Sequence, residues 1–334
     1  MFPVYYATVV VGNDAGQGDI WWGRAISLSM AIVALSSPFL GGIADHARMQ
    51  KRLLIIYTCL CVSATASLFF VQRGMVLEGF VLAVLANVGM EGGVVFYNAF
   101  LKDIATTAYQ GRVSGWGFGT GYLGSIVSLL LGLMLYRMGH IQLVWPMVAV
   151  FFTVFSLPAF LFLPADEKSH TGIIEGARRG LANTFWVLKR IALNKPQRRF
   201  LIAYLIYEDG VNTAIAFSAI FAVSTLSFTT AQVVPLFFII QATALIGAFA
   251  MARPIDYWGP KRVASISLAL WTLTVTVIYF TQTKLQFMII ASVAGLGLGT
   301  VQASSRAFFS QFIPEGNESE YFGVYSLVGK SSAV

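Results

Sequence analysis

The chain has 334 residues, of which 57% are hydrophobic and only 11% are charged, and its formal net charge is +7. Soluble domains usually carry about 25% charged residues, so this composition excludes an ordinary soluble protein and indicates one that crosses a membrane several times. The positive charge does not indicate a nucleic-acid partner, because the basic residues lie in short loops between apolar runs.

Apolar runs of about 20 residues, the length that crosses a bilayer core at about 1.5 Å per residue, follow one another along the chain. Nine of them predict complete transmembrane helices, at residues 21–41, 53–71, 75–101, 114–136, 144–163, 200–223, 233–252, 263–281 and 285–309. Shorter apolar runs at 2–11 and 321–334 predict two partial helices. We therefore expect a fragment of a longer protein, or a reading frame that starts late and ends early.

Residues 164–199 form a basic segment that separates residues 1–163, the expected N-terminal half, from residues 200–334, the expected C-terminal half. Apolar residues recur in it at steps of three and four, which predicts an amphipathic helix on the inner membrane surface. We favour a structural linker helix over a calmodulin-like partner site. The apolar residues are Ile174, Ala177, Leu181, Phe185, Leu188 and Ala192, and the basic residues are Lys168, Arg178, Arg179, Lys189, Arg190, Lys195, Arg198 and Arg199.

Basic residues concentrate in alternate loops, which predicts that these loops, including the linker 164–199, are cytoplasmic. The chain is thus expected to be a multi-pass integral protein of the plasma membrane, or of the inner membrane in a bacterium. Outside the linker, the basic set comprises Arg48, Lys51, Arg52, Lys102, Arg112, Arg253, Lys261, Arg262 and Arg306, whereas the opposite loops hold only Arg73, Arg137 and Lys284.

Two pairs of similar segments indicate an internal repeat. Asp45 and Asp256, each followed by a Lys-Arg pair, lie 211 residues apart, and Asn98-Ala-Phe-Leu recurs as Arg306-Ala-Phe-Phe 208 residues later. A period near 210 residues covers six helices. Because six is even, the repeat predicts two parallel halves related by an axis along the membrane normal.

The Asp45 and Asp256 loops, with Lys51, Arg52, Lys261 and Arg262, resemble the gating loops of the major facilitator superfamily. Residues 96–101 (FYNAFL), 111–124 (GRVSGWGFGTGYLG), 207–215 (YEDGVNTAI) and 322–333 (FGVYSLVGKSSA) more narrowly resemble the UMF1 family, which is related to the fungal vacuolar effluxers of the Atg22 type.

The resemblance implies an all-α membrane protein with the major facilitator fold. Its two parallel six-helix halves would contain twelve helices, of which this chain lacks most of helix 1, the end of helix 11 and helix 12. His46, Arg48 and Tyr257 depart from the superfamily pattern, so a fully charged gating contact is not expected in either copy. The family resemblance also implies export of amino acids by alternating access.

Glu91 lies in the middle of a predicted span. Placing an ionisable group at the centre of a bilayer costs about 2.5–3.5 kcal/mol, so such a residue is expected to have a specific role. Asn87 and Asn98 share its helical face, at four residues before and seven after. The equivalent position in the other repeat is Gly299. A carboxyl group that only held the scaffold together would more plausibly recur in both repeats, so this difference favours a functional role for Glu91. The alternative is a hydrogen bond between helices, made by a protonated Glu91.

Asp209 and Glu208 are adjacent in the middle of another span, with Asn212 one turn on. Two neighbouring carboxyl groups cannot easily both ionise in a site of low dielectric constant, so one of them is a candidate to load and unload a proton. The alternative is a polar contact that holds the helix in the bundle. Gln241 and Gln302 are uncharged, and each either lines a polar route or bonds to a neighbouring helix.

In members of the superfamily, helices 1, 4, 7 and 10 line the central cavity, so the resemblance implies that Glu91, Asp209 and Gln302 converge. The prediction is a monomeric secondary active transporter of a small solute such as an amino acid, with the proton as a hypothetical driving ion. Two alternatives remain, a lipid-handling carrier and a membrane sensor or scaffold without transport. No catalytic or metal-binding pattern is present, so we expect neither an enzyme nor a cofactor.

Overall fold

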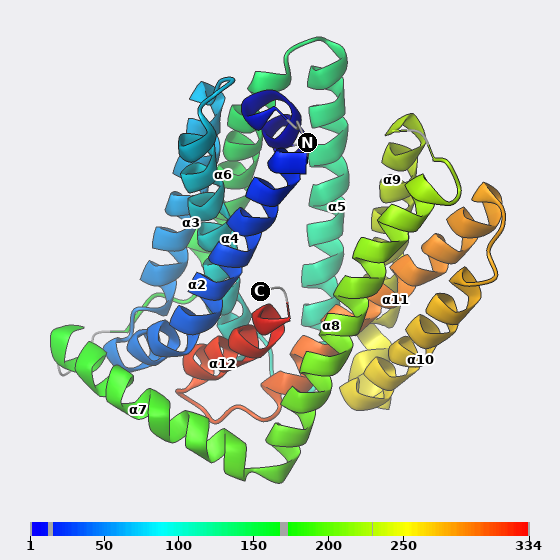
Figure 1. The fold of residues 1–334 in the computed structure, drawn as a ribbon. Coiled ribbons are helices and arrows are strands. Elements are labelled where there is room, and N and C mark those ends of the chain that lie inside the picture. The colour runs from blue at the N-terminus through cyan, green and yellow to red at the C-terminus, as the bar shows by residue number, and fades with distance from the viewer. Residues whose placement is uncertain (1, 13–15, 168–172, 229, 333–334) are drawn as a thin grey trace. The chain divides into compact units, whose positions relative to one another are not determined.

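The computed structural model describes residues 2–12, 16–167, 173–228 and 230–332. Within these ranges the chain is helical and forms no strand (Figure 1). Nine helical segments of the described chain are long and apolar enough to cross a membrane. They correspond to the nine predicted spans, so the prediction of an all-α membrane protein is confirmed. Lys168 of the linker lies outside the described residues.

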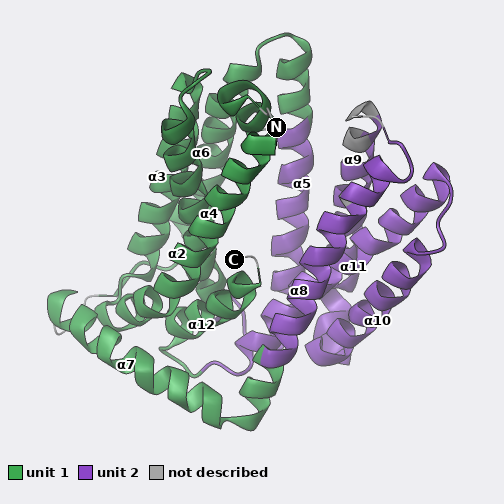
Figure 2. Ribbon diagram, viewed as in Figure 1, with its two compact units in different colours: residues 1–100, 130–201, 314–334 green, residues 101–129, 202–313 purple. Residues whose placement is uncertain are grey.

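The chain forms two compact units, coloured separately in Figure 2. Unit 1 comprises residues 1–100, 130–201 and 314–334, and unit 2 comprises residues 101–129 and 202–313. Each unit therefore draws on segments from both sides of the linker. The division into halves at 1–163 and 200–334, which follows from the repeat, stays a prediction.

Unit 1 holds most of the helices that precede the linker, the linker helix itself and the last helix. Its elements are α1 (Phe2–Tyr5), η1 (Tyr6–Val11), α2 (Gln17–Ala47), α3 (Gln50–Ser67), η3 (Leu68–Phe70), α4 (Val76–Ile104), η4 (Ile141–Leu143), α6 (Val144–Phe162), α7 (Ile173–Leu193) and α12 (Glu318–Ser331). The last residues of α4 belong to unit 2.

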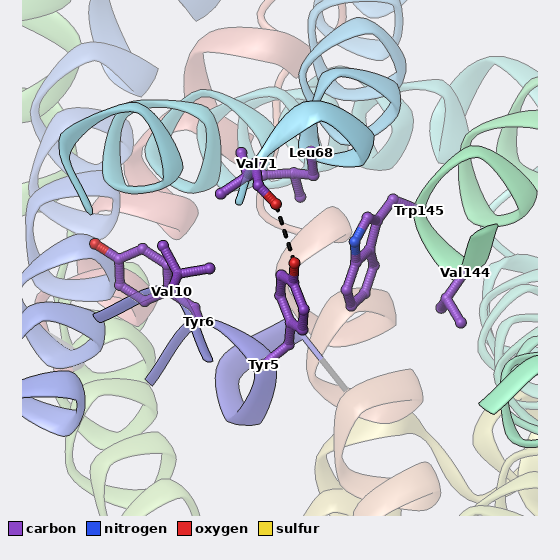
Figure 3. Close-up of a cluster of buried hydrophobic side chains, with 7 residues drawn as sticks. All are labelled: Tyr5, Tyr6, Val10, Leu68, Val71, Val144 and Trp145. Atoms are coloured by element: carbon purple, nitrogen blue, oxygen red, sulfur yellow. Dashed lines mark hydrogen bonds between the residues drawn. The ribbon is translucent and has the colours of Figure 1, made fainter. Parts of the chain in front are cut away.

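An aromatic cluster closes one end of unit 1 (Figure 3). Tyr5 and Trp145 pack with ring centroids 5.6 Å apart, and the Tyr5 hydroxyl donates to the Val71 carbonyl at 3.0 Å. Tyr6 is fully buried beside them and donates to the Val76 carbonyl at 2.8 Å. A buried tyrosine normally needs such a partner for its hydroxyl. The short apolar run at 2–11 is thereby fixed against the segment that follows η3 and against α4 and α6.

Small residues bring α12 and α7 close to α2. A Cβ atom added to Gly41 would lie 2.3 Å from the Ser319 carbonyl oxygen, and one added to Gly323 would lie 2.3 Å from that of Ser37. On the α7 side, a Cβ atom at Gly180 would lie 2.3 Å from the Gly42 oxygen. Membrane helices associate through such small residues because lipid tails are as apolar as leucine and provide no hydrophobic driving force.

Unit 2 uses the same kind of packing. Its helices are most of α5 (Gln110–Arg137), most of α8 (Lys195–Ser224), α9 (Thr230–Trp258), α10 (Pro260–Ile278) and α11 (Lys284–Ser310). A Cβ atom at Gly299 would lie 2.0 Å from the Ala244 oxygen, and one at Gly247 would lie 2.2 Å from the Leu296 oxygen. The backbones of α9 and α11 are therefore in direct contact.

Candidate functional site

An ion pair joins α4 and α12 in unit 1. Lys330 Nζ lies 2.6 Å from Glu91 Oε2, and their side chains are only 26% and 13% exposed. Glu91 occupies the middle of a membrane-spanning helix, as the sequence predicts. Its partner is a lysine in the last turn of α12. The pair gives each charge the opposite charge that a low-dielectric environment requires.

The surroundings of Glu91 are both polar and closely packed. Asn87 donates from Nδ2 to the Ser29 hydroxyl of α2 at 2.5 Å, and Asn98 is buried. A Cβ atom at Gly92 would lie 2.2 Å from the Tyr57 ring. The glycine next to Glu91 therefore admits an aromatic ring of α3. This packing fixes α4 and with it the position of the carboxylate.

Unit 2 contains a second polar cluster, formed by α5, α8 and α11. The Tyr122 hydroxyl donates to Gln302 Oε1 at 2.5 Å, and the hydroxyls of Tyr207 and Ser305 are 2.6 Å apart. Glu208 interacts electrostatically with both tyrosines. Two of the predicted residues, Gln302 and Glu208, thus belong to one cluster.

Other predicted residues lie outside this cluster's hydrogen bonds. Asp209 and Asn212 are exposed on α8, and Gln241 is half-buried in α9. Sequence reasoning missed Lys330 as a partner of Glu91, and it missed Tyr122 and Tyr207. One signal was present, because a lysine within an apolar helix needs a carboxylate or an exit to the membrane surface.

Asp45 accepts hydrogen bonds from the start of another helix. Its Oδ1 accepts from the backbone N–H of Ser319 at 3.0 Å, and its Oδ2 accepts from that of Glu320 at 2.8 Å. These are the second and third residues of α12, whose own N-cap residue Asn317 makes no side-chain cap. A carboxylate at this place satisfies unpaired amides and complements the helix dipole.

The same arrangement occurs at two further helix starts. Asp166 accepts from the backbone N–H groups of Lys51 and Arg52 at 2.7 and 3.0 Å, at the start of α3. Asp256 is only 5% exposed in its side chain and accepts from the backbone N–H of Arg112, at the start of α5. The two aspartates of the repeat thus bind helix N-termini, and Asp256 also lies 3.6 Å from the Arg112 guanidinium.

The basic residues of the predicted gating loops lie in the first turns of α3 and α10. Lys51 donates from Nζ to the Leu163 carbonyl at 2.6 Å, and Arg52 lies 3.7 Å from Asp166. Lys261 and Arg262 are exposed. The loop after α2 is therefore bound to the end of α6 within unit 1.

Arg306 requires a correction, because the sequence grouped it with the loop charges. It lies inside α11, is only 3% exposed, and donates to the hydroxyl and the carbonyl of Ser114, both at 2.9 Å. Its guanidinium also lies 4.5 Å from the centroid of the Phe118 ring. A planar guanidinium can stack and donate at once, so Arg306 joins α11 to α5.

The fold is shared with solved transporters. The human organic anion transporter MFSD10 superimposes with a TM-score of 0.78 at 14% identity, over 95% of this chain and 76% of that one. The proton:xylose symporter XylE superimposes with a TM-score of 0.70 at 12% identity, over 96% and 78% of the two chains. These likenesses show the major facilitator fold.

Sequence comparison gives the family. The uncharacterized MFS-type transporter YxiO of Bacillus subtilis is 26% identical to this chain, over 100% of this chain and 81% of YxiO. Autophagy-related protein 22 of Vanderwaltozyma polyspora is 24% identical, over 99% of this chain and 69% of that protein. The family model described as "Vacuole effluxer Atg22 like" matches residues 24–110 and 102–334. The chain therefore belongs to the vacuole effluxer Atg22-like family of major facilitator transporters.

Proposed function

We propose that this transporter exports small zwitterionic solutes, with amino acids as the substrate class, by proton-coupled alternating access. The observation that carries the proposal is the ion pair between Glu91 and Lys330, which are held 2.6 Å apart with little solvent exposure. Such a pair provides one negative and one positive group side by side within the membrane-spanning part of unit 1. An amino acid carries the complementary two charges at a similar spacing.

The proposed exchange is that the substrate ammonium binds Glu91 and the substrate carboxylate binds Lys330. Neither charge is then left without a partner when the ion pair opens. The side chains of the pair are only 26% and 13% exposed, so separating them without a substrate would leave two poorly solvated charges unpaired, and opening without a substrate is disfavoured. A neutral solute cannot replace both charges, which gives the pair selectivity for zwitterions.

Proton coupling is proposed to use carboxyl groups in both units. A proton on Glu91 removes its negative charge and so competes with Lys330 for the carboxylate. In unit 2, Glu208 interacts electrostatically with Tyr122 and Tyr207, and its carboxyl group is proposed as the second proton carrier. The family description of an effluxer supports the proposed direction of transport, which is export.

Asp45, Asp166 and Asp256 are proposed to act as gating contacts that hold together the helices of their own units, at the basic end of each, by binding helix N-termini. The positive-inside rule places this basic end, with the linker 164–199, in the cytoplasm. The transporter is proposed to work as a monomer, without a cofactor.

Flux in proteoliposomes tests this function. Full-length protein would be reconstituted, loaded with radiolabelled amino acids and given an imposed pH gradient. We expect efflux that accelerates severalfold with an inward proton gradient and that falls when the gradient is collapsed. Efflux that ignores the gradient for every amino acid tested would contradict proton coupling.

The same vesicles separate the two alternatives. A membrane sensor or scaffold predicts no flux of any solute. A lipid-handling carrier predicts that labelled phospholipid moves between leaflets while amino acids stay inside. Either outcome would overturn the proposed function.

A further inference from the structure

The linker helix α7 has an exposed apolar stripe next to its buried face. Its buried residues are Gly176, Gly180, Thr184, Val187 and Ile191. The stripe is formed by Ile174, Leu181 and Phe185, which are 87%, 43% and 66% exposed. These three residues are spaced by seven and four, so they lie along one side of the helix. A group of large, exposed apolar residues indicates a surface that contacts a membrane or another apolar surface.

Two basic residues border the stripe. Arg178 follows Ile174 by four residues and Lys189 follows Phe185 by four, so both lie at the same edge of the stripe. Both are exposed, and they are separated by roughly 16 Å along the helix axis, given about 1.5 Å per residue. Arg179 lies on the other side, where it pairs with Glu175 at 3.0 Å.

Phe185, the last residue of the stripe, lies against α2. The rings of Phe185 and Phe39 are in edge contact with centroids 5.8 Å apart, and Phe39 belongs to the membrane-spanning part of α2. The close approach of Gly180 to Gly42 fixes α7 against the same end of α2. An amphipathic helix in this place buries its apolar face at the boundary between headgroups and acyl chains, and its basic side chains extend toward the headgroups.

We propose that α7 is a binding site for anionic phospholipids. Ile174, Leu181 and Phe185 insert at the acyl boundary of the leaflet, and Arg178 and Lys189 bind the phosphates of neighbouring headgroups. Inorganic phosphate in solution lacks the apolar part of this contact, so the occupant is the lipid itself. The spacing of the two basic residues allows two separate headgroups to be bound at once.

Bound lipid would act on the helices that α7 contacts. Asn183 donates from Nδ2 to Glu320 Oε2 of α12 at 3.0 Å, and Glu320 is fully buried. The Thr184 hydroxyl donates to the Pro38 carbonyl of α2 at 3.4 Å and, within α7, to the Gly180 carbonyl at 3.1 Å. Lipid that holds α7 on the membrane therefore stabilises the packing of α2 with α12.

Fluorescence of a labelled full-length chain tests the site. In a background in which Cys59 and Cys61 are replaced by alanine, Ile174→Cys would carry an environment-sensitive dye in nanodiscs. The lipid would be phosphatidylcholine alone or mixed with phosphatidylglycerol, with acyl-brominated lipid as the quencher. We expect blue-shifted, quenched emission that increases with phosphatidylglycerol. In Arg178→Gln/Lys189→Gln, the mole fraction of phosphatidylglycerol for half-maximal quenching should rise severalfold.

Arg179→Gln is the matched control for the single variant Arg178→Gln, because each removes one positive charge, the two positions are adjacent, and Arg179 lies away from the edge of the stripe. It should quench as the unsubstituted chain does, and thermal unfolding of each variant would confirm that it is folded. A dye that stays exposed to water in both bilayers would overturn the proposal. So would an equal effect of Arg179→Gln, or full competition by inorganic phosphate, since either would indicate only diffuse charge attraction.

Discussion

Replacement of Glu91 by glutamine should lower amino acid transport about a hundredfold, since loss of the charged partner of the substrate ammonium costs about 3 kcal/mol of binding, which corresponds to two powers of ten. The variant leaves Lys330 without the carboxylate that now lies 2.6 Å from it. It also removes the group that would bind the substrate ammonium. Initial rates of radiolabelled amino acid efflux from proteoliposomes measure the effect.

Two controls separate transport from folding. Glu78→Gln makes the same substitution in the first turn of the same helix, at an exposed position, and should transport normally. The reversed pair Glu91→Lys/Lys330→Glu keeps an ion pair and should recover thermal stability. Its transport should stay low, because the positive group would then lie where the substrate ammonium binds and the negative group where the substrate carboxylate binds. Full transport by Glu91→Gln would contradict a role for this carboxylate.

Replacement of Gly299 by alanine should destabilise unit 2 by about 1–3 kcal/mol, the usual cost of overpacking. The added Cβ atom would lie 2.0 Å from the Ala244 oxygen and 3.0 Å from the Ala248 nitrogen. Both are backbone atoms, so α9 and α11 must separate. Thermal unfolding of the purified protein in detergent measures this as a lower midpoint.

Gly121→Ala is the matched control for that loss. Gly121 lies in α5, and a Cβ atom there would meet nothing within 4 Å. Alanine in a helix is favoured over glycine by about 1 kcal/mol, so this variant should be as stable as the parent or more stable. An unchanged midpoint in Gly299→Ala would show that α9 and α11 are not in backbone contact.

The helices could be predicted from the sequence because the bilayer fixes their length. Each of the nine predicted spans lies in a helix long enough to cross a membrane, within the part of the chain that the structure describes. The linker helix was also predicted, and its apolar residues Ile174, Leu181 and Phe185 are indeed exposed along one side. Its buried face was not predicted. Gly176 and Gly180 pack by close approach of the backbones, and glycines add nothing to the periodic pattern of hydrophobic residues from which a buried face is predicted.

The partners of the charged residues could be predicted less well. Glu91 stood out because a carboxylate is costly in a membrane, but no pattern in the sequence relates α4 to the last turn of α12. Asp45 and Asp256 were recognised through their repeated loops. Their partners are backbone N–H groups. Every residue except proline carries one, so the side chains around those groups do not indicate the contact. Arg306 was assigned to a loop because of its charge, although it lies within a predicted apolar span.

Binding of modified amino acids to the purified protein tests the exchange at the ion pair most directly. Calorimetric titration would compare a transported amino acid with its N-acetyl and carboxamide derivatives, each of which lacks one of the two charges. If the substrate replaces both sides of the Glu91–Lys330 pair, each derivative should bind at least tenfold more weakly. Equal binding of all three compounds would contradict it.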